Sequence, residues 1–148
     1  MINDRPRVIH LTKRAESGYD EGRAGATITP GMLIALNSSG VYVPHASADA
    51  IASPTFAIED ALQGNTIDDN YASGDLTRMI HAVTGDHVLA ILEAGANVTD
   101  GTKLTSNGAG YLQSGDADSD AVAVALEDRD ASASDVTLEE RRIRVRIL

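Results

Sequence analysis

Residues 28–42 read ITPGMLIALNSSGVY, and residues 98–112 read VTDGTKLTSNGAGYL. When the sequence is shifted by 70 positions, Thr, Gly, Asn and Gly coincide in the two stretches, and each stretch begins with an apolar residue. In both, a short run that contains apolar residues is followed by an Asn, and a Gly stands three residues after that Asn. Asn and Gly tolerate the positive φ angles that tight turns require. Each stretch therefore predicts a β-hairpin, with turns at residues 37–40 and 107–110.

A second similarity follows each hairpin. The tetrapeptide AIED at 57–60 is matched by ALED at 125–128, at an offset of 68. The repeated order of hairpin and strand indicates a duplicated β unit, although chance similarity between glycine-rich hairpins is an alternative. A repeat with two copies favours a pseudo-symmetric barrel over a solenoid.

Short apolar runs separated by Gly, Asn and Asp continue along the chain from Ile28. This spacing is typical of an all-β fold, a small β-barrel or sandwich built from hairpins. TGDH at 84–87 is predicted to join two such runs as a further hairpin turn. Residues 46–52 and 138–142 could form a helical turn or two. The predicted strands are 32–36, 41–43, 55–61, 77–83, 88–92, 104–105, 111–113, 121–126 and 142–148.

The first 27 residues differ from the rest in their mixed charge and in having one short apolar alternation, at residues 8–11. We expect an extended N-terminal arm over residues 1–27, with a flexible stretch at 18–25, and a β domain over residues 28–148. A frayed terminus is the alternative to an arm that binds a partner. The cations available for such binding are Arg5, Arg7, Lys13, Arg14 and Arg23.

The last seven residues, RIRVRIL, predict a strand with two different faces. Side chains alternate across a strand, so Ile143, Val145 and Ile147 share a face that is expected to enter the core. The opposite face carries Arg142, Arg144 and Arg146, which are candidates for contact with water, acidic neighbours or a second copy of the chain.

Composition limits the partners. The 148 residues include four Tyr, one Phe and no Trp, so the core must be built from smaller aliphatic side chains, and self-association would add stability. The net charge is -10, and residues 26–138 carry sixteen acidic side chains against three basic ones. Such a surface disfavours nucleic acid. No apolar stretch is long enough to span a membrane, and the N-terminus lacks the apolar run of a secretory signal.

Motifs for catalysis or metal binding are weak. The chain has no Cys, no G-x-S-x-G and no H-x-x-x-H, so we expect neither an enzyme nor a cofactor. His81 and His87 flank the 84–87 turn and could meet across it. Asp116, Asp118 and Asp120, with Glu127 at the twelfth position, have the spacing of a calcium loop. Position six is Ala121 rather than Gly, which favours an acidic solvated loop instead.

The stretch AGANVTDGTKLTSNGAGYLQSGDADSDAVAVALEDRD, residues 94–130, resembles the head-decoration (cement) proteins of tailed bacterial or archaeal viruses. Those proteins carry a G-x-x-[IV]-x-x-G-x-x-L-x-S-x-x-x-G-x-[LV] hairpin and then an A-[VI]-A-x-[AL]-E strand. TPGMLIALNSSGVYVPHA, from residue 29, looks like the N-terminal hairpin of the family. The matching residues are Gly95, Val98, Gly101, Leu104, Ser106, Gly110, Leu112 and Ala123 to Glu127.

The resemblance covers about two-thirds of the chain, and it implies a β-rich, often trimeric protein without catalytic activity. It further implies a protein that is made in the host cytoplasm and lies on the outer surface of the virion capsid, with the major capsid protein and the chain itself as partners. Under this interpretation the five N-terminal cations contact the capsid. The main alternative is a carbohydrate- or cell-binding β module, which would need exposed aromatic side chains gathered in one place.

Overall fold

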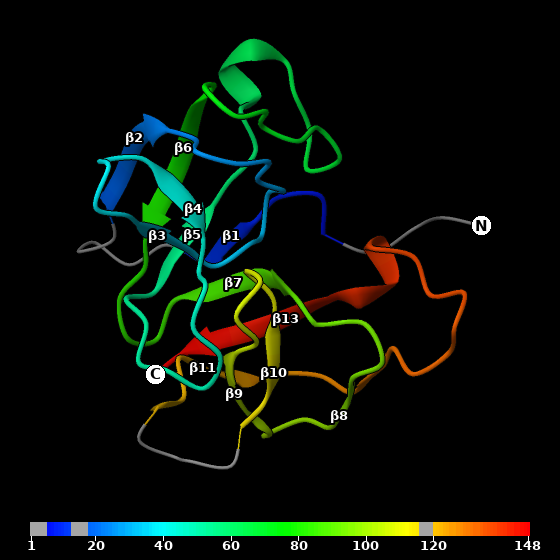
Figure 1. The fold of residues 1–148 in the computed structure, drawn as a ribbon. Coiled ribbons are helices and arrows are strands. Elements are labelled where there is room, and N and C mark those ends of the chain that lie inside the picture. Colours follow the sequence, from blue (N-terminus) through cyan, green and yellow to red (C-terminus); the bar gives the residue numbers. More distant parts are fainter. Residues whose placement is uncertain (1–5, 13–17, 116–119) are drawn as a thin grey trace.

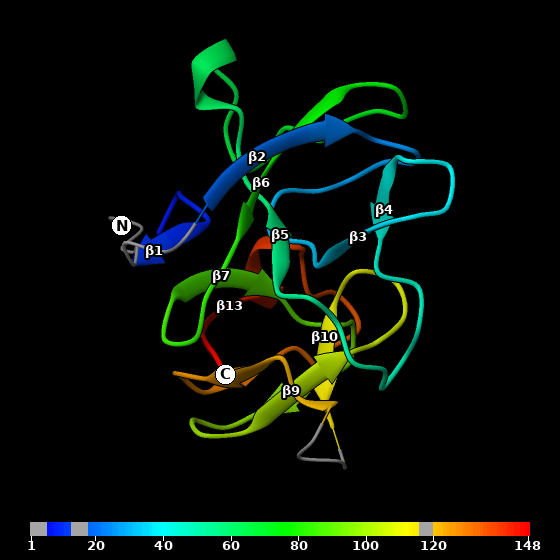
Figure 2. The ribbon, with the colours of Figure 1, turned by 90° about the vertical axis from the view of Figure 1, so that its left-hand side faces the viewer.

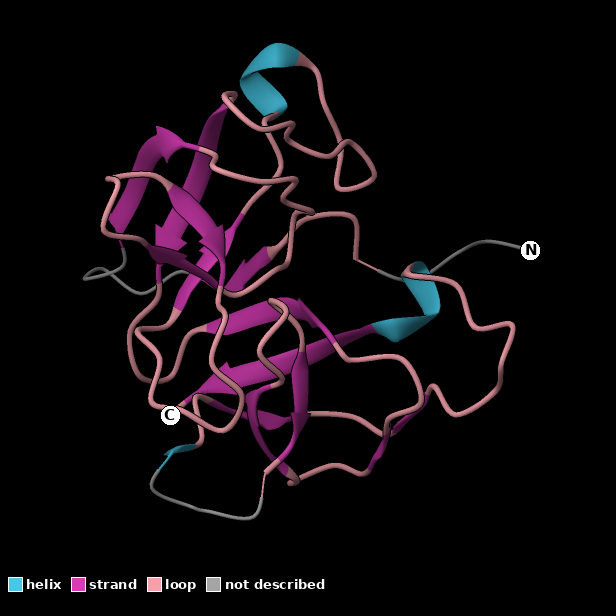
Figure 3. Ribbon diagram, in the orientation of Figure 1, coloured by secondary structure: helices cyan, strands magenta, loops and turns pink. Residues whose placement is uncertain are grey.

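The computed structural model describes residues 6–12, 18–115 and 120–148 (Figure 1). The described residues form strands, turns and short 3-10 helices, of which η1 and η3 are described in full, and they contain no α-helix (Figure 3). The predicted all-β fold is confirmed. The strands are β1 (His10–Thr12), β2 (Gly18–Arg23), β3 (Ile34–Leu36), β4 (Tyr42–Pro44), β5 (Thr55–Ala57), β6 (Leu76–His81), β7 (His87–Ile91), β8 (Asn97–Val98), β9 (Lys103–Ser106), β10 (Leu112–Ser114), β11 (Ala123–Ala125), β12 (Arg129–Asp130) and β13 (Arg142–Ile147). The helices are η1 (Ala61–Gln63) and η3 (Glu139–Arg141).

The chain is built from two similar units, which we call the first unit (residues 18–81) and the second unit (residues 86–147). In the first, the strand order is β2-β6-β5, and an isolated bridge between Leu33 and Phe56 continues it to the β3–β4 hairpin. In the second, the order is β7-β13-β11-β9-β10. Strand β1 pairs with the outer edge of β7. The two units lie as two layers, the first above the second in Figure 2.

The two predicted hairpins are confirmed, and they share the same strand register and the same hydrogen bonds in their turns. Ile34 pairs with Pro44 in β3–β4, and Leu104 pairs with Ser114 in β9–β10, so the registers differ by the predicted 70 residues. The Oδ1 atom of each turn Asn accepts two backbone N–H groups of its own turn. These bonds run from Ser39 and Val41 to Asn37 at 2.9 and 3.2 Å, and from Ala109 and Tyr111 to Asn107 at 2.9 and 3.1 Å.

The equivalence extends beyond the hairpins. The first turn of each unit bonds to the strand that follows its hairpin, through Gly31 N to Ala57 O and Gly101 N to Ala125 O. Strand β2 pairs with β6 as β7 pairs with β13. Each residue of β7 stands 68 positions after its equivalent in β2. The duplicated unit predicted from the sequence is therefore present in the fold.

Neither unit is a closed barrel. In each unit, one parallel bridge joins the second strand of the hairpin to the residue that follows the first strand of the unit. The bridges are Tyr42 to Ala24 and Leu112 to Leu92. Each sheet curls on itself, but no sheet of the described residues closes, and the arrangement is that of a sandwich.

Aliphatic side chains from both units fill one main core. It includes Phe56 and Ile80 of the first unit and Leu104 and Val145 of the second, all fully buried. The prediction for the last strand holds on this face, since Ile143, Val145 and Ile147 are buried together. A smaller cluster around Ile28, Met79 and Tyr71 fills the interior of the first unit.

The described residues before Ile28 pack on the body. Ile9 is fully buried in the main core, and β2 pairs with β6 along its whole length. The predicted flexible stretch at 18–25 therefore contains a six-residue strand, because its partner lies more than fifty residues away in sequence. The division of the chain at residue 27 stays a prediction.

The 84–87 turn is present, but it does not make a hairpin. Gly85 has φ +94°, and Asp86 N donates to Val83 O. Strand β6 then lies between β2 and β5, whereas β7 lies between β1 and β13, so the turn joins the two layers. His81 and His87 consequently do not meet: His81 pairs with Thr55, and His87 pairs with Arg146.

Candidate interaction surfaces

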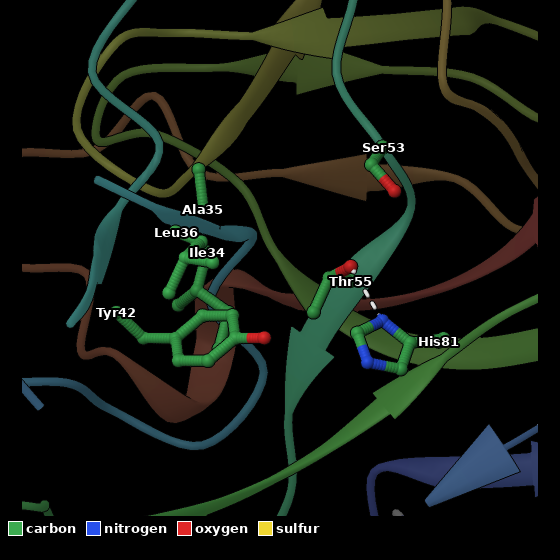
Figure 4. Close-up of a pocket in the computed structure, with 7 residues that line it drawn as sticks. All are labelled: Ile34, Ala35, Leu36, Tyr42, Ser53, Thr55 and His81. Atoms are coloured by element: carbon green, nitrogen blue, oxygen red, sulfur yellow. Dashed lines mark hydrogen bonds between the residues drawn. The ribbon is translucent and has the colours of Figure 1, made fainter. Parts of the chain in front are cut away.

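A hollow of about 310 Å³ opens at the hairpin end of the first unit (Figure 4). The curl of the sheet places the β3–β4 hairpin opposite β5 and β6, and the side chains between them line the hollow. Thr55 Oγ1 and His81 Nδ1 are 3.0 Å apart at one wall. Leu36, on the other wall, is 59% exposed. The lining residues are Ile34, Ala35, Leu36, Tyr42, Ser53, Thr55 and His81.

The equivalent end of the second unit is filled by the chain itself. Ser106 occupies the position of Leu36, and its Oγ lies 2.6 Å from His45 Nδ1. Asp49 N donates to Ser106 O, and Asp49 Oδ1 accepts from Thr105 Oγ1 at 2.8 Å. The segment between β4 and β5 thus covers the second unit and leaves the first uncovered.

The exposed edge of β2 lies beside this hollow. Asp20 connects the two, because its Oδ2 lies 3.1 Å from His81 Nε2 while its Oδ1 accepts Glu21 N at 2.8 Å. The bond with His81, followed by the one from Glu21 N, lowers the pKa of the Asp20 carboxyl below its usual value. A second hollow of about 290 Å³ lies over β2 and is lined by Tyr19, Asp20, Glu21 and Arg78.

The arginine face of β13 is divided. Arg144 and Arg146 are exposed, as expected for residues that could contact a partner. Val124 of β11 lies opposite Arg146 on one side and opposite Lys103 on the other. Arg146 and Lys103 therefore lie on the same face of the second unit. The equivalent residues of the first unit, Ile80 and Leu33, are fully buried.

Arg142, by contrast, is buried, which corrects its assignment as a self-association residue. Its Nη1 donates to Pro30 O at 2.7 Å and its Nη2 to Ile67 O at 2.8 Å. Burial lowers the pKa of the guanidinium. The turn at Gly31 passes so close that a Cβ there would lie 2.7 Å from Nη1. Arg142 therefore fastens two loops of the first unit to β13 and is unavailable to another chain.

The N-terminal cations are not equivalent either. Arg7 pairs with Asp68 and, at 3.2 Å, with Glu139, and the hydrogen bond with Asp68 raises its pKa. Arg23 is exposed and donates to Gly74 O. Arg5, Lys13 and Arg14 lie outside the described residues. Arg7 thus already has partners within the chain.

The aspartate-rich loop is described only in part, since Asp116 and Asp118 lie outside the described residues. Asp120 is half-buried. Glu127 Oε1 accepts from Arg129 and from Arg144 N, at 2.9 and 3.0 Å. Within residues 6–12, 18–115 and 120–148, no group of three or more His, Asp or Glu side chains could hold a metal ion.

His45 and Ser106 form a pair with the residue types of a nucleophile and its base, but both are buried. Ser106 Oγ also accepts Gly108 N at 3.1 Å, so the hydroxyl is part of the hairpin structure. Burial lowers the pKa of His45. We interpret the pair as the attachment of the covering segment to the second unit.

Sequence reasoning missed the hollow and the edge of β2. Residues 18–24, GYDEGRA, and 86–92, DHVLAIL, are equivalent in the fold but share no identical residue. Only the pairing of β2 with β6 reveals this equivalence. Among the described residues, no helix is long and apolar enough to cross a membrane.

Comparison with known proteins adds one finding. No protein-family model matches the chain, and no curated protein matches it by sequence. Among solved structures, the chain is similar to the N base of the head fiber protein gp8.5 of bacteriophage phi29, with a TM-score of 0.58 and 16% identity. The match covers 89% of this chain and 94% of the other. This chain and the N base therefore share a fold over nearly the whole of both chains.

Proposed function

We propose that the protein is a structural component of a viral particle that binds the outer surface of the assembled major-capsid lattice and stabilises it. The observation that carries this proposal is the shared fold with a phage head fiber base, which extends over both chains. The resemblance of the hairpin and strand of the second unit to head-decoration proteins favours the same role.

Stabilisation would follow from mass action. A protein that binds the assembled lattice and not its separated subunits shifts the equilibrium toward the lattice. Many copies on one particle would strengthen this effect through multivalent attachment. The candidates for contact with the shell are Arg5, Arg7, Lys13, Arg14 and Arg23. Since Arg7 and Arg23 also form hydrogen bonds within the chain, replacing them would remove those bonds as well as any shell contact.

The test is co-sedimentation of the purified protein with particles that lack it, followed by the temperature at which those particles release their genome. We expect saturable binding and a higher release temperature. Replacing Arg5, Lys13 and Arg14 by Gln should weaken binding at least tenfold. Neutralising side chains is preferable to deleting residues 1–27, because that deletion would remove β2 and the buried Ile9.

Arg144→Gln together with Arg146→Gln serves as the companion variant. These exposed arginines remain candidates for self-association, for which a trimer is expected from the resemblance, so their loss should lower the molar mass measured by light scattering. Absence of binding by the unmodified protein at micromolar concentration would contradict the proposed function.

A carbohydrate- or cell-binding module is less well supported. Phe56 and Tyr71 are buried, and Arg141 lies 4.8 Å above the Tyr111 ring. Tyr19 and Tyr42 line different hollows. These aromatic side chains do not form a common platform on which a sugar could stack.

A further inference from the structure

The duplication reveals a position in the first unit that is filled in the second. Strand β7 is the equivalent of β2, and its outer edge is covered by β1. Strand β2 forms the edge of its sheet, and no other strand of the described residues pairs with that side. The two units thus have the same slot for an extended strand, which β1 occupies in the second unit and no described strand occupies in the first.

The hydrogen bonds at the slot correspond. Leu89 N donates to Ile9 O, the carbonyl just before β1, at 2.8 Å. Glu21 is the equivalent of Leu89, and its N–H donates to the Asp20 side chain at the same distance of 2.8 Å. A side-chain oxygen therefore occupies the place that a backbone carbonyl of a neighbouring strand takes in the second unit. An incoming strand could displace it without loss of a hydrogen bond, because the released carboxylate is exposed to water.

The edge of β2 is negatively charged, so it would attract a strand with cationic side chains. In the second unit, His10 of β1 pairs with Val88, whose equivalent in the first unit is Asp20. Asp20 and Glu21 are both exposed, so residues opposite them would form favourable cross-strand pairs if they were Lys or Arg.

A second copy of β2 does not suit this edge. If two β2 strands paired antiparallel along all six residues, Asp20 of one copy would oppose Glu21 of the other. Like charges directly opposite one another destabilise a strand pair, and such charges are a common means of preventing edge-to-edge association.

We propose that the edge of β2 binds an extended, basic segment of another protein by strand addition, antiparallel and in the register that β1 adopts on β7. Backbone hydrogen bonds at Glu21 provide affinity, and Asp20 and Glu21 select for cationic side chains. The inference rests on the proposed function only in naming the shell protein as the source of that segment.

The direct test uses peptides and does not require particles. An end-capped octapeptide of Val, Thr and Lys, with two adjacent Lys at its centre so that one faces Asp20 and the other Glu21, is titrated into the full ¹⁵N-labelled chain. Backbone amide shifts and hydrogen exchange are followed. We expect saturable shifts confined to residues 18–23 and slower exchange at Glu21. The Leu89 amide, whose slot is already filled, should not respond. The same peptide with a central Pro, or with Glu in place of Lys, should bind at least tenfold more weakly.

Two charge-matched variants sharpen the test. Asp20→Lys with Glu21→Lys should weaken peptide binding at least tenfold. Asp135→Lys with Glu140→Lys changes the net charge equally at exposed positions of the second unit, and should leave binding within twofold. Equal binding of the Lys and Glu peptides, or shifts mapped to the second unit, would overturn the inference. Concentration-dependent changes at Glu21 without peptide would also overturn it, because they would identify a second copy as the occupant.

Particles then identify the source of the segment. The chain has no cysteine, so Arg23→Cys provides a single attachment point for a photo-crosslinker at the β2 edge. Crosslinking to a basic stretch of the shell protein is expected. Particle binding without any crosslink to the shell would exclude the shell as the source while leaving the proposed function intact. If the peptide binds but particles do not, the proposed function fails and the strand-addition site stands.

Discussion

The burial of His45 makes the stability of the folded protein depend on pH. Its ring lies against Ser106, and burial lowers its pKa below the usual 6.5. Since the folded protein favours the neutral ring, the unfolded chain binds the proton more readily below about pH 6.5. Stability should therefore be greatest above that pH and fall as the pH drops through the lowered value.

The measurement is the urea midpoint of unfolding between pH 8 and pH 5, for the natural protein and for His45→Gln. His10, His81 and His87 are present in both proteins, so the difference between the two curves isolates His45. We expect the natural protein to lose more stability on acidification. Parallel curves would contradict the assignment of this residue.

Arg142 is the other residue whose environment decides its role. Arg142→Met retains the aliphatic stem but leaves the carbonyls of Pro30 and Ile67 without their donors. Buried acceptors that lose a charged donor cost about 1.5–3 kcal/mol. Arg144→Met, on the exposed face of the same strand, should change the free energy of unfolding by less than about 0.5 kcal/mol. Urea denaturation of the two variants gives the comparison, and equal losses would show that the Arg142 bonds contribute nothing.

At the scale of elements, the equivalent hairpins offer a matched pair of glycines. Gly40 and Gly110 have φ angles of +77° and +85°, so an added Cβ is strained in both, by about 1 kcal/mol. At Gly40 the Cβ would meet nothing within 4 Å, whereas at Gly110 it would lie 2.9 Å from Pro44 Cβ. Gly110→Ala should therefore cost about 1–3 kcal/mol more than Gly40→Ala. Thermal unfolding of the two variants measures this difference, and similar midpoints would contradict the packing seen at Gly110.

The elements also show what could be predicted from the sequence. Asn37 and Asn107 bond within their own turns, so the local sequence is sufficient to predict both hairpins. Strand β2 depends on β6, far along the chain, and its residues carry no apolar alternation that would reveal it. The alternation in the last strand predicted its buried face. It could not show that Arg142 is covered by loops of the other unit while Arg144 is not, because that depends on how the units pack.

At the scale of the whole molecule, the two units are similar in path and different in surface. The second unit receives a covering segment at its hairpin end and a strand at its edge, both from the other part of the chain. The first unit receives neither among the described residues. Both hollows described above involve residues of the first unit. The duplicated fold thus contains one unit whose edge and hairpin end are covered and one in which, among the described residues, they are not.

The shared core predicts that the two units unfold together. Ile80 of the first unit and Val145 of the second are both fully buried in the same cluster, and the segment between β4 and β5 of the first unit covers the second. Calorimetry should therefore show one transition, with equal calorimetric and van't Hoff enthalpies. Ile80→Ala should lower its midpoint by an amount that corresponds to about 2–5 kcal/mol. Val145→Ala should shift the same single transition by a smaller amount, because it removes fewer methyl groups. If either variant split the transition in two, the units would be independent, and the strand slot on the first unit could then open without loss of the second.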